Sequence, residues 1–214
     1  MQIEIFSDVV CPWCYIGKRR LDAVLATEAG QGIGVTWRPY QLYPQIPEGG
    51  VDRDTFLEAR FGADADPARV YEPVSREARS VGLELDFSAI RVAPNTFRAH
   101  CLLSWAEFSG RQHALAEVLF RYYFSEGRDV GDPAELMRAA ADAGLDPEAA
   151  AAMLADDEEA GKVRSELALA EAVGVTGVPF FVLAGKFAIP GAQSEEVMAQ
   201  LITRARERLD GASP

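Results

Sequence analysis

Two cysteines at positions 11 and 14 are the side chains of this 214-residue chain best suited to chemistry. Cys11 follows a short apolar run, and residues 15–29 carry apolar side chains at helical spacing. We therefore expect Cys11 at a strand-to-helix junction, where free backbone N–H groups and the helix dipole favour a thiolate nucleophile. Cys14 lies one helical turn further on. It is placed to attack a mixed disulfide at Cys11 and to close a Cys11–Cys14 bridge.

A metal site is the main alternative for two cysteines at this spacing. A structural zinc site needs four ligands, often with a second closely spaced pair of Cys or His. Outside the motif only Cys101, His100 and His113 remain, and they supply no such pair. We therefore predict redox chemistry and no metal, with inert cysteines as the remaining alternative.

Side chains close to the cysteines each have two interpretations. Pro12 suits the first turn of a helix, which needs no N–H donor there. Trp13 either tunes the redox potential and partner contact or is partly buried against the rest of the chain. Lys18 lies four residues after Cys14 and either stabilises a thiolate or is solvated. Asp8 either assists proton transfer or fixes the loop.

The composition excludes several classes of function. The chain carries a formal net charge of −12 and is 49% hydrophobic, so we expect a sizeable core and no basic phosphate-binding surface. No apolar run reaches the roughly 18 residues of a membrane span, and the N-terminus does not resemble a signal peptide. We therefore expect no nucleic-acid or membrane partner and a cytoplasmic protein. Three cysteines are too few for a disulfide scaffold.

The residues around the motif predict a β-α-β unit. A strand precedes Cys11, the helix over residues 15–29 follows it, and Ile33, Val35 and Trp37 alternate with other residues as in a half-buried second strand. Several prolines and a glycine pair after this strand break regular structure. We expect the first structural unit to end there, near position 48.

The other end of the chain predicts a β-β-α unit. Phe180–Leu183 and residues 186–189 read as strands, and Ala184 with Gly185 between them is typical of a hairpin turn. Ser194 is a suitable N-cap for a last helix that runs to about position 209.

Between these two units, residues typical of helix starts and helix ends predict a series of helices. Three Asp-Pro pairs each place an N-cap acceptor before a proline that fits the first helical position, and three glycines mark helix ends. These are Asp66-Pro67, Asp132-Pro133 and Asp146-Pro147, with Gly62, Gly82 and Gly144. We predict an α/β protein in which residues 1–48 and 175–214 form one sheet domain and residues 49–174 form a large all-helical insertion.

Two apolar faces of the insertion are expected in the core. They consist of Phe97, Cys101, Trp105 and Phe108 on one helix and of Leu115, Leu119 and Tyr122 on the next. On such a face Cys101 is expected to act as a small hydrophobe and not as a third redox partner. The aromatic run Tyr122, Tyr123 and Phe124 is expected to pack between the domains, with a substrate-facing wall as the alternative.

Several motifs, in order along nearly the whole chain, resemble the FrnE-like branch of the DsbA family. They are Cys11-Pro12-Trp13-Cys14 with Tyr15-Ile16-Gly17-Lys18, then Trp37-Arg38-Pro39, Asn95-Thr96 with Ala99-His100, Gly177-Val178-Pro179-Phe180-Phe181, and Gly191-Ala192-Gln193. The resemblance implies a thioredoxin fold with an inserted helical domain. It also implies that Pro179 is cis and faces the cysteine pair.

The resemblance adds candidate substrate-binding residues. Pro179 has no N–H to donate to a strand neighbour, which leaves the backbone of Val178 free to pair with an extended substrate. The motif containing Asn95, Thr96 and His100 implies that these residues border the active-site cleft, and structural hydrogen bonding is the alternative. With Pro12 and Trp13 these residues complete the predicted substrate site.

Three functions remain open on this basis. The first is a thiol–disulfide oxidoreductase acting on a protein or small-molecule thiol or disulfide, with no bound cofactor and with glutathione as a candidate co-substrate. The second follows from related 2-hydroxychromene-2-carboxylate isomerases and kappa-class glutathione transferases, which typically carry serine where this chain has Cys11. It is a glutathione-dependent isomerase or transferase for an aromatic or polyketide-like molecule. The third is a peptide-holding chaperone.

Overall fold

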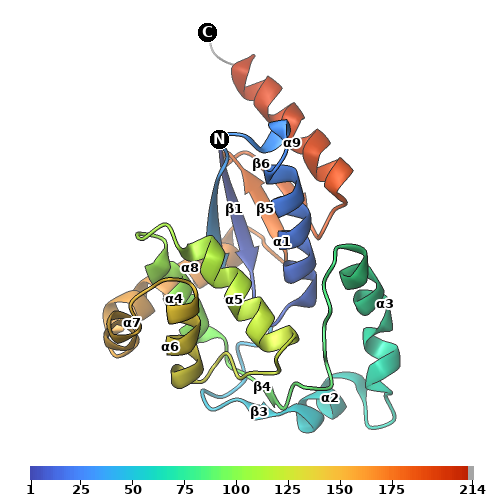
Figure 1. The fold of residues 1–214 in the computed structure, drawn as a ribbon, viewed down its shortest axis with the longest axis vertical. Coiled ribbons are helices and arrows are strands. Elements are labelled where there is room, and N and C mark those ends of the chain that lie inside the picture. The colour runs from blue at the N-terminus through green and yellow to red at the C-terminus, as the bar shows by residue number, and fades with distance from the viewer. Residues whose placement is uncertain (212–214) are drawn as a thin grey trace.

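The computed structural model describes residues 1–211 and is built around a four-stranded mixed sheet (Figure 1). The strands follow the order β2-β1-β5-β6, with β1 parallel to β2 and β5 antiparallel to both of its neighbours. Their bounds are Gln2–Ser7 for β1, Gly34–Pro39 for β2, Phe180–Leu183 for β5 and Phe187–Pro190 for β6. The two ends of the chain therefore meet in one sheet, as the sequence predicts.

Helix α1 (Pro12–Leu25) follows β1 after a short loop, and α9 (Glu195–Asp210) packs against it. The predicted helix is displaced toward the N-terminus because Pro12 occupies its first turn. It ends early because the Thr27 hydroxyl and backbone N–H both bond to the carbonyl of Val24, and a 3₁₀ turn (Glu28–Gly30) follows. Ser194 caps α9 through its side chain, as expected.

The Asp-Pro pairs begin helices as predicted. Helices α3 (Pro67–Ser80), α6 (Pro133–Asp142) and α7 (Pro147–Leu154) each start at the proline, and the preceding aspartate accepts a backbone N–H of the first turn. Such a cap contributes about 1 kcal/mol to helix stability. These boundaries depend on contacts within a few residues, which explains why the sequence predicts them.

The insertion is helical apart from one short strand pair. Its other helices are α2 (Arg53–Phe61), α4 (Phe97–Ala106), α5 (Gln112–Phe124) and α8 (Asp157–Ala172). The all-helical expectation is wrong in one detail, because β3 (Val51–Asp52) pairs with β4 (Val92–Ala93). This pair fixes the start of α2. In Figure 1, α6 and α7 lie at one side of the molecule and α2 and α3 at the other, with α1 and α5 between them.

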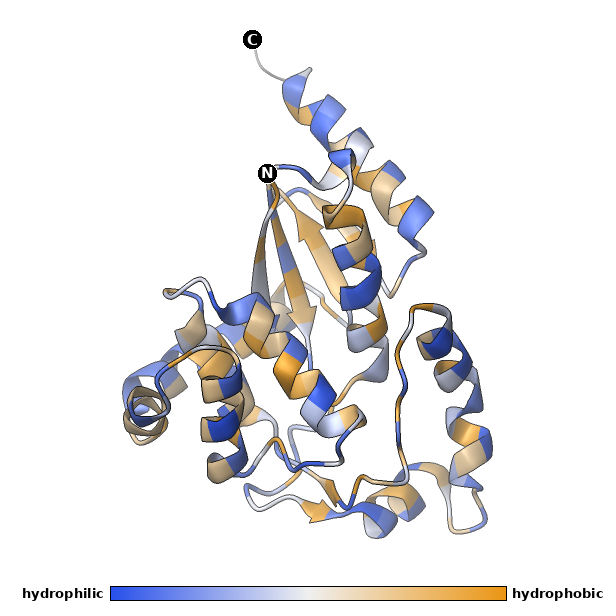
Figure 2. Cartoon of the chain, in the orientation of Figure 1, coloured by the Kyte–Doolittle hydropathy of each residue, from blue (hydrophilic) through white to orange (hydrophobic). Residues whose placement is uncertain are grey.

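The insertion and the sheet share one buried core. Helices α4, α5 and α8 all pack against β2, and one apolar cluster runs through both parts. Figure 2 shows that β5 is hydrophobic, whereas β1, α3 and α9 mix hydrophobic and hydrophilic residues. The boundaries at 48/49 and 174/175 stay a prediction, and residues 212–214 of the predicted last segment lie outside the described part of the chain.

The predicted apolar faces are largely buried. Leu115, Leu119 and Tyr122 are in the core, and Cys101 is 4% exposed, with burial raising the pKa of its thiol to about 11. Phe108 is the exception, because its side chain is 86% exposed. Helix α4 ends at Ala106, so Phe108 lies in the following turn and no longer shares the buried face.

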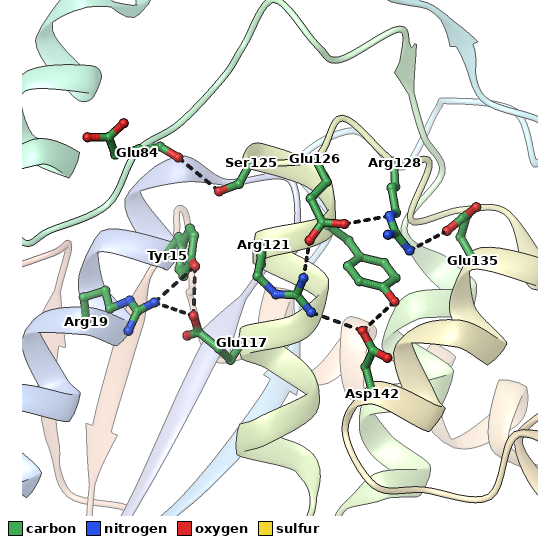
Figure 3. A network of polar contacts seen from close by, with 11 residues as sticks. Tyr15, Arg19, Glu84, Glu117, Arg121, Ser125, Glu126, Arg128, Glu135 and Asp142 are labelled. Atoms are coloured by element: carbon green, nitrogen blue, oxygen red, sulfur yellow. Dashed lines mark hydrogen bonds and ion pairs between the residues drawn. The ribbon is translucent and has the colours of Figure 1, made fainter.

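The interface between α1 and α5 combines a stacked aromatic pair with ion pairs. Figure 3 shows the contacts among Tyr15, Arg19 and Glu117. The rings of Tyr15 and Phe120 stack with centroids 5.0 Å apart. The Tyr15 hydroxyl donates to Glu117 Oε1 at 2.9 Å, and Arg19 pairs with the same carboxylate. Burial, together with the negative charge of Glu117, raises the pKa of Tyr15 to about 12. This interface holds the helix that carries the cysteine motif.

Candidate active site

Cys11 lies at the N-cap position of α1, at the predicted strand-to-helix junction. Its carbonyl accepts the backbone N–H of Cys14 at 3.0 Å, which begins the helix. The two cysteines are free, come within 3.5 Å of each other and are 4% and 1% exposed. The Cys11 thiol also points at the carbonyl oxygen of Val178, with an Sγ–O distance of 3.6 Å. The motif and the far end of the chain therefore form one site.

The two thiols have different environments. Burial raises the pKa of the Cys14 thiol well above its ordinary value, and contact with Cys11 adds to the increase. The side chain of Ser7 and the backbone N–H of Asp8 act in the opposite direction but do not cancel it. Cys14 therefore keeps its proton near neutral pH. Cys11 lines an open cavity, whereas Cys14 does not.

The Val178–Pro179 peptide bond is cis and lies beside the cysteine pair, which confirms the expectation from the family resemblance. Helix α1 approaches this loop closely at Gly17. A Cβ atom at position 17 would lie 3.1 Å from Pro179 Cγ and 3.2 Å from the ring of Phe181, closer than ordinary side-chain contacts. Gly17 therefore allows the motif helix and the Pro179 loop to pack together.

A cavity of about 440 Å³ opens over Cys11. Its floor contains residues of the motif and of the Val178 loop, and aromatic side chains, all but Tyr43 from the insertion, form much of its wall. Floor residues are Cys11, Pro12, Trp13, Gly177 and Val178, and the aromatic wall comprises Tyr43, Phe56, Phe61, Tyr71, Phe87, Tyr123 and Phe124. The volume lies within the roughly 300–1,000 Å³ typical of small-molecule sites.

These observations, a cysteine pair at a helix start beside a cis-proline loop, agree with the comparison of the sequence with known families. The sequence pattern of the DSBA-like thioredoxin domain matches residues 2–203. The chain belongs to the DsbA-like thioredoxin-domain family. This confirms the family and the fold that the motifs imply.

Several proteins are similar to this chain over most or all of their length. A probable DsbA oxidoreductase from Streptomyces coelicolor is 35% identical, with a TM-score of 0.87 over 100% of this chain and 92% of that chain. YwbO of Bacillus subtilis, an uncharacterized protein, is 26% identical over 97% of this chain and 98% of its own. The cytosolic disulfide reductase DsbM of Pseudomonas aeruginosa, solved with glutathione, is 19% identical, with a TM-score of 0.65 over 96% of this chain and 100% of that chain.

Of three further predicted site residues of the DsbA-like chain, Asn95 is held by structural hydrogen bonds, whereas Thr96 and His100 are buried. The side chain of Asn95 donates to the carbonyl of Ile46 at 2.6 Å and accepts the backbone N–H of Phe97 at 2.9 Å. Thr96 is the buried N-cap of α4, and His100 is 2% exposed. None of the three lines the cavity over Cys11. Their contribution to substrate binding stays a prediction, whereas Pro12, Trp13 and Val178 do line the cavity.

Asp8 fixes a loop beneath the motif. Its Oδ2 accepts the backbone N–H of Leu42 at 2.7 Å, and its Oδ1 lies 3.4 Å from His100 Nε2. Both side chains are almost fully buried. The predicted loop-fixing role is therefore visible in the contacts, while proton transfer by Asp8 stays a prediction.

Lys18 is neither solvated nor directed at the cysteines. Its side chain is 4% exposed, and its ammonium group pairs with Asp22 at 2.7 Å and with Glu117 at 2.9 Å. The expectation of a solvated lysine is wrong because α5 covers this face of α1. A stabilising role toward the Cys14 thiolate is not supported, since two carboxylates already occupy the ammonium group.

The aromatic run at the end of α5 divides between two roles. Tyr123 and Phe124 line the cavity, as the alternative of a substrate-facing wall predicts. Tyr122 is buried elsewhere, and its hydroxyl donates to Asp142 at 2.9 Å. Arg53 is 8% exposed and lines the same cavity, which the sequence does not predict. Its position in the first turn of an otherwise exposed helix gives no signal of burial.

The described residues contain no group of three or more His, Cys, Asp or Glu side chains arranged to bind a metal ion. None of the helices in residues 1–211 combines the length and apolar character that crossing a membrane requires.

Proposed function

We propose that this DsbA-like protein is a thiol–disulfide oxidoreductase in which Cys11 exchanges with the substrate and Cys14 resolves the intermediate. The observation that carries the proposal is the asymmetry of the pair: two free thiols lie within 3.5 Å, and only Cys11 lines the open cavity. Membership of a DsbA-like family and a 35% identical probable DsbA oxidoreductase support it.

The reaction has two exchange steps. In the first, the Cys11 thiolate attacks one sulfur of a substrate disulfide, the substrate S–S bond breaks, and one substrate thiolate leaves. In the second, Cys14 loses its proton and attacks the Cys11 sulfur, which breaks the mixed disulfide and releases the other substrate sulfur as a thiolate. The Cys11–Cys14 bridge then holds the oxidation equivalent of the original disulfide. The reverse sequence oxidises a dithiol substrate.

The structure around the pair supports particular roles for its neighbours. Val178 presents its carbonyl to Cys11 and borders the cavity, so we assign it to positioning the bound substrate beside the thiol. Burial raises the pKa of the Cys14 thiol, so Cys14 must lose its proton before the second step, because only a thiolate attacks. We further propose glutathione as a co-substrate, supported by a structure of DsbM with glutathione.

The experiment is a trapping assay with glutathione disulfide. The Cys14→Ser variant should accumulate one glutathionyl group on Cys11, detected by intact-protein mass spectrometry, because the resolving step is lost. Cys11→Ser should not react at this site. The matched control is Cys101→Ser, which removes a buried thiol outside the pair and should exchange like the wild type. Exchange that continues at an unchanged rate in Cys11→Ser would refute the proposal.

The aromatic cavity favours a second candidate, a glutathione-dependent isomerase or transferase acting on a small aromatic molecule. That function uses the thiol of bound glutathione. It predicts saturable glutathione binding and an activity that survives Cys14→Ala. The oxidoreductase predicts the opposite result for Cys14→Ala in multiple turnovers. The peptide-holding chaperone and the cytoplasmic location stay predictions.

A further inference from the structure

Arg53 carries a buried charge in the wall of the cavity over Cys11. Its side chain lies in the first turn of α2 and is 8% exposed. The guanidinium carbon lies 5.4 Å from the ring centroid of Phe56 and 5.5 Å from that of Tyr71. Both rings line the cavity with it. An arginine side chain stays charged in proteins, so the aromatic wall contains a fixed cation.

The protein satisfies this guanidinium only in part. Arg53 Nη2 donates to the Tyr71 hydroxyl at 2.6 Å, and Nη1 reaches the Tyr123 hydroxyl at 3.5 Å. The Nε–H group is buried and has no acceptor within residues 1–211. No carboxylate of the described residues forms an ion pair with Arg53, which is unusual because taking a charge out of water without a counter-ion is costly.

Other shielded cations of this chain do have carboxylate partners. Lys18 has two, and the Arg20 side chain, 12% exposed, pairs with Glu77. Two acids act electrostatically on the neighbouring Tyr123, namely Asp8 and Asp129, but neither pairs with Arg53. Asp8 accepts the backbone N–H of Leu42, and Asp129 accepts that of Gly131. Arg53, in the cavity wall, therefore differs from Lys18 and Arg20 in having no carboxylate partner among the described residues.

We propose that the cavity binds small disulfides whose aromatic body carries a carboxylate, and that Arg53 pairs with this carboxylate. The aromatic wall fits the ring, and the free donors of the guanidinium fit a carboxylate, which accepts charge-assisted hydrogen bonds. The cavity volume of about 440 Å³ suits a small molecule. This inference rests on the proposed exchange function and adds to it a substrate class.

The reaction follows the two exchange steps already described. The Cys11 thiolate attacks one sulfur of the aryl disulfide, and one carboxylated aryl thiolate leaves as the S–S bond breaks. Cys14 loses its proton and attacks the Cys11 sulfur, and the second aryl thiolate leaves as the Cys11–Cys14 bridge forms. Arg53 takes no part in bond making. It is a substrate-binding residue, so its removal should selectively slow the exchange of Cys11 with anionic aryl disulfides.

The test compares three disulfides by stopped-flow kinetics with the reduced protein. The probes are 5,5′-dithiobis(2-nitrobenzoate), which is aromatic and carboxylated, 4,4′-dithiodipyridine, which is aromatic and neutral, and glutathione disulfide, which is carboxylated without a ring. Arg53→Met should slow the first probe by about 10-fold or more and the neutral probe by less than about twofold. Arg76→Met is the control, since it removes an exposed charge of α3 that does not line the cavity, and it should change both rates by less than about threefold.

Three outcomes would overturn the inference. In the first, Arg53→Met leaves the rate of exchange with the carboxylated aryl disulfide unchanged. In the second, it lowers the rate with the neutral probe by the same factor. In the third, it lowers the rate with glutathione disulfide as much as the rate with the carboxylated aryl probe. Failure of Cys11 to exchange with any of the three disulfides would instead refute the proposed function. The binding of the carboxylate is then still tested by the next measurement, which needs no reactive thiol.

Binding of 1-naphthoate and the neutral 1-naphthalenemethanol to Cys11→Ser can be followed by tryptophan fluorescence, because Trp13 lines the cavity. We expect the Cys11→Ser protein, with Arg53 intact, to prefer the carboxylate by about 10-fold or more, and Arg53→Met to lose this preference. If Arg53→Met does not fold, the preference for 1-naphthoate can still be measured in Arg53→Lys and in the Cys11→Ser protein itself. Equal affinity of the Cys11→Ser protein for both probes would contradict the inference.

Discussion

Two regions of this protein bury cations in opposite ways. At the interface of α1 and α5, Lys18 and Arg19 meet the carboxylate of Glu117, and Lys18 also meets Asp22. At the wall of the cavity over Cys11, Arg53 is 8% exposed, and its polar partners among residues 1–211 are phenol hydroxyls beside aromatic rings. In the first region the cations pair with carboxylates of the protein, and in the second no carboxylate of the described residues pairs with the cation.

The difference separates structural charges from charges available to a ligand. When both partners of a buried ion pair belong to the protein, replacing either one destabilises the fold, because the other charge is left uncompensated. A buried cation without a partner can gain its counter-ion from a bound molecule. We therefore expect substitutions at the α1–α5 interface to affect stability and substitutions at Arg53 to affect binding.

The largest expected effect is that of Glu117→Gln. The change leaves Lys18 with one carboxylate and Arg19 without its partner, so we expect the free energy of unfolding to fall by about 2–3 kcal/mol. Urea denaturation followed by circular dichroism measures it. Glu58→Gln, at an exposed position of α2, is the matched control and should change stability by less than about 0.5 kcal/mol. If Glu117→Gln lowered the free energy of unfolding by no more than Glu58→Gln does, the contrast between the two regions would be refuted.

A smaller effect is expected for Asp22 as the pH falls. Burial acts to raise the pKa of this carboxyl, but the hydrogen bond from His113 and the charge of Lys18 outweigh it and lower the pKa below 3.8. A depressed pKa contributes stability above the unfolded value, and the contribution is lost as the pH falls through the folded value. The stability difference between wild type and Asp22→Asn should therefore shrink below about pH 3.8. Unfolding curves at pH 6 and pH 3 test this, and an unchanged difference would count against the pairing.

The imidazole of His113 has a defined tautomer in this network. Trp37 Nε1 is only a donor and lies 3.2 Å from His113 Nδ1, so Nδ1 accepts and Nε2 carries the proton directed at Asp22, 2.7 Å away. The interface thus extends from β2 through α5 to α1. It explains why Asp22 keeps its charge although it is partly buried.

The smallest expected effect on stability is that of Arg53→Met. The variant loses two hydrogen bonds to phenols but also removes a buried charge that has no counter-ion within residues 1–211, so we expect a net change of less than about 1 kcal/mol. The same denaturation experiment as for Glu117→Gln measures it. A loss as large as that of Glu117→Gln would show that Arg53 is a structural charge, and it would contradict the comparison.

Local signals in the sequence account for much of the fold. Asp66, Asp132 and Asp146 cap helices through atoms only two or three residues away, so the pattern alone predicts them. The hairpin turn at Ala184 and Gly185 is equally local, since both residues adopt positive φ. The position of Cys11 at the start of α1 follows from the strand and helix that flank it.

The parts that the sequence does not predict depend on distant contacts. Arg53 is buried because Tyr71 and Tyr123, 18 and 70 residues away, surround it. Lys18 is buried because α5 covers it with Glu117. Phe108 leaves the core because α4 ends two residues earlier than the apolar pattern does. In each case the pattern along one helix does not contain the partner that decides the outcome.

The most direct test of the central claim is the redox equilibrium of the wild-type protein in a series of glutathione and glutathione disulfide ratios. Samples are quenched in acid, denatured and alkylated, and each cysteine is read by peptide mass spectrometry. We predict that Cys11 and Cys14 lose alkylation together as one two-electron couple, while Cys101 stays a free thiol at every ratio. Cys11 and Cys14 that remain alkylated under the most oxidising conditions would contradict the account.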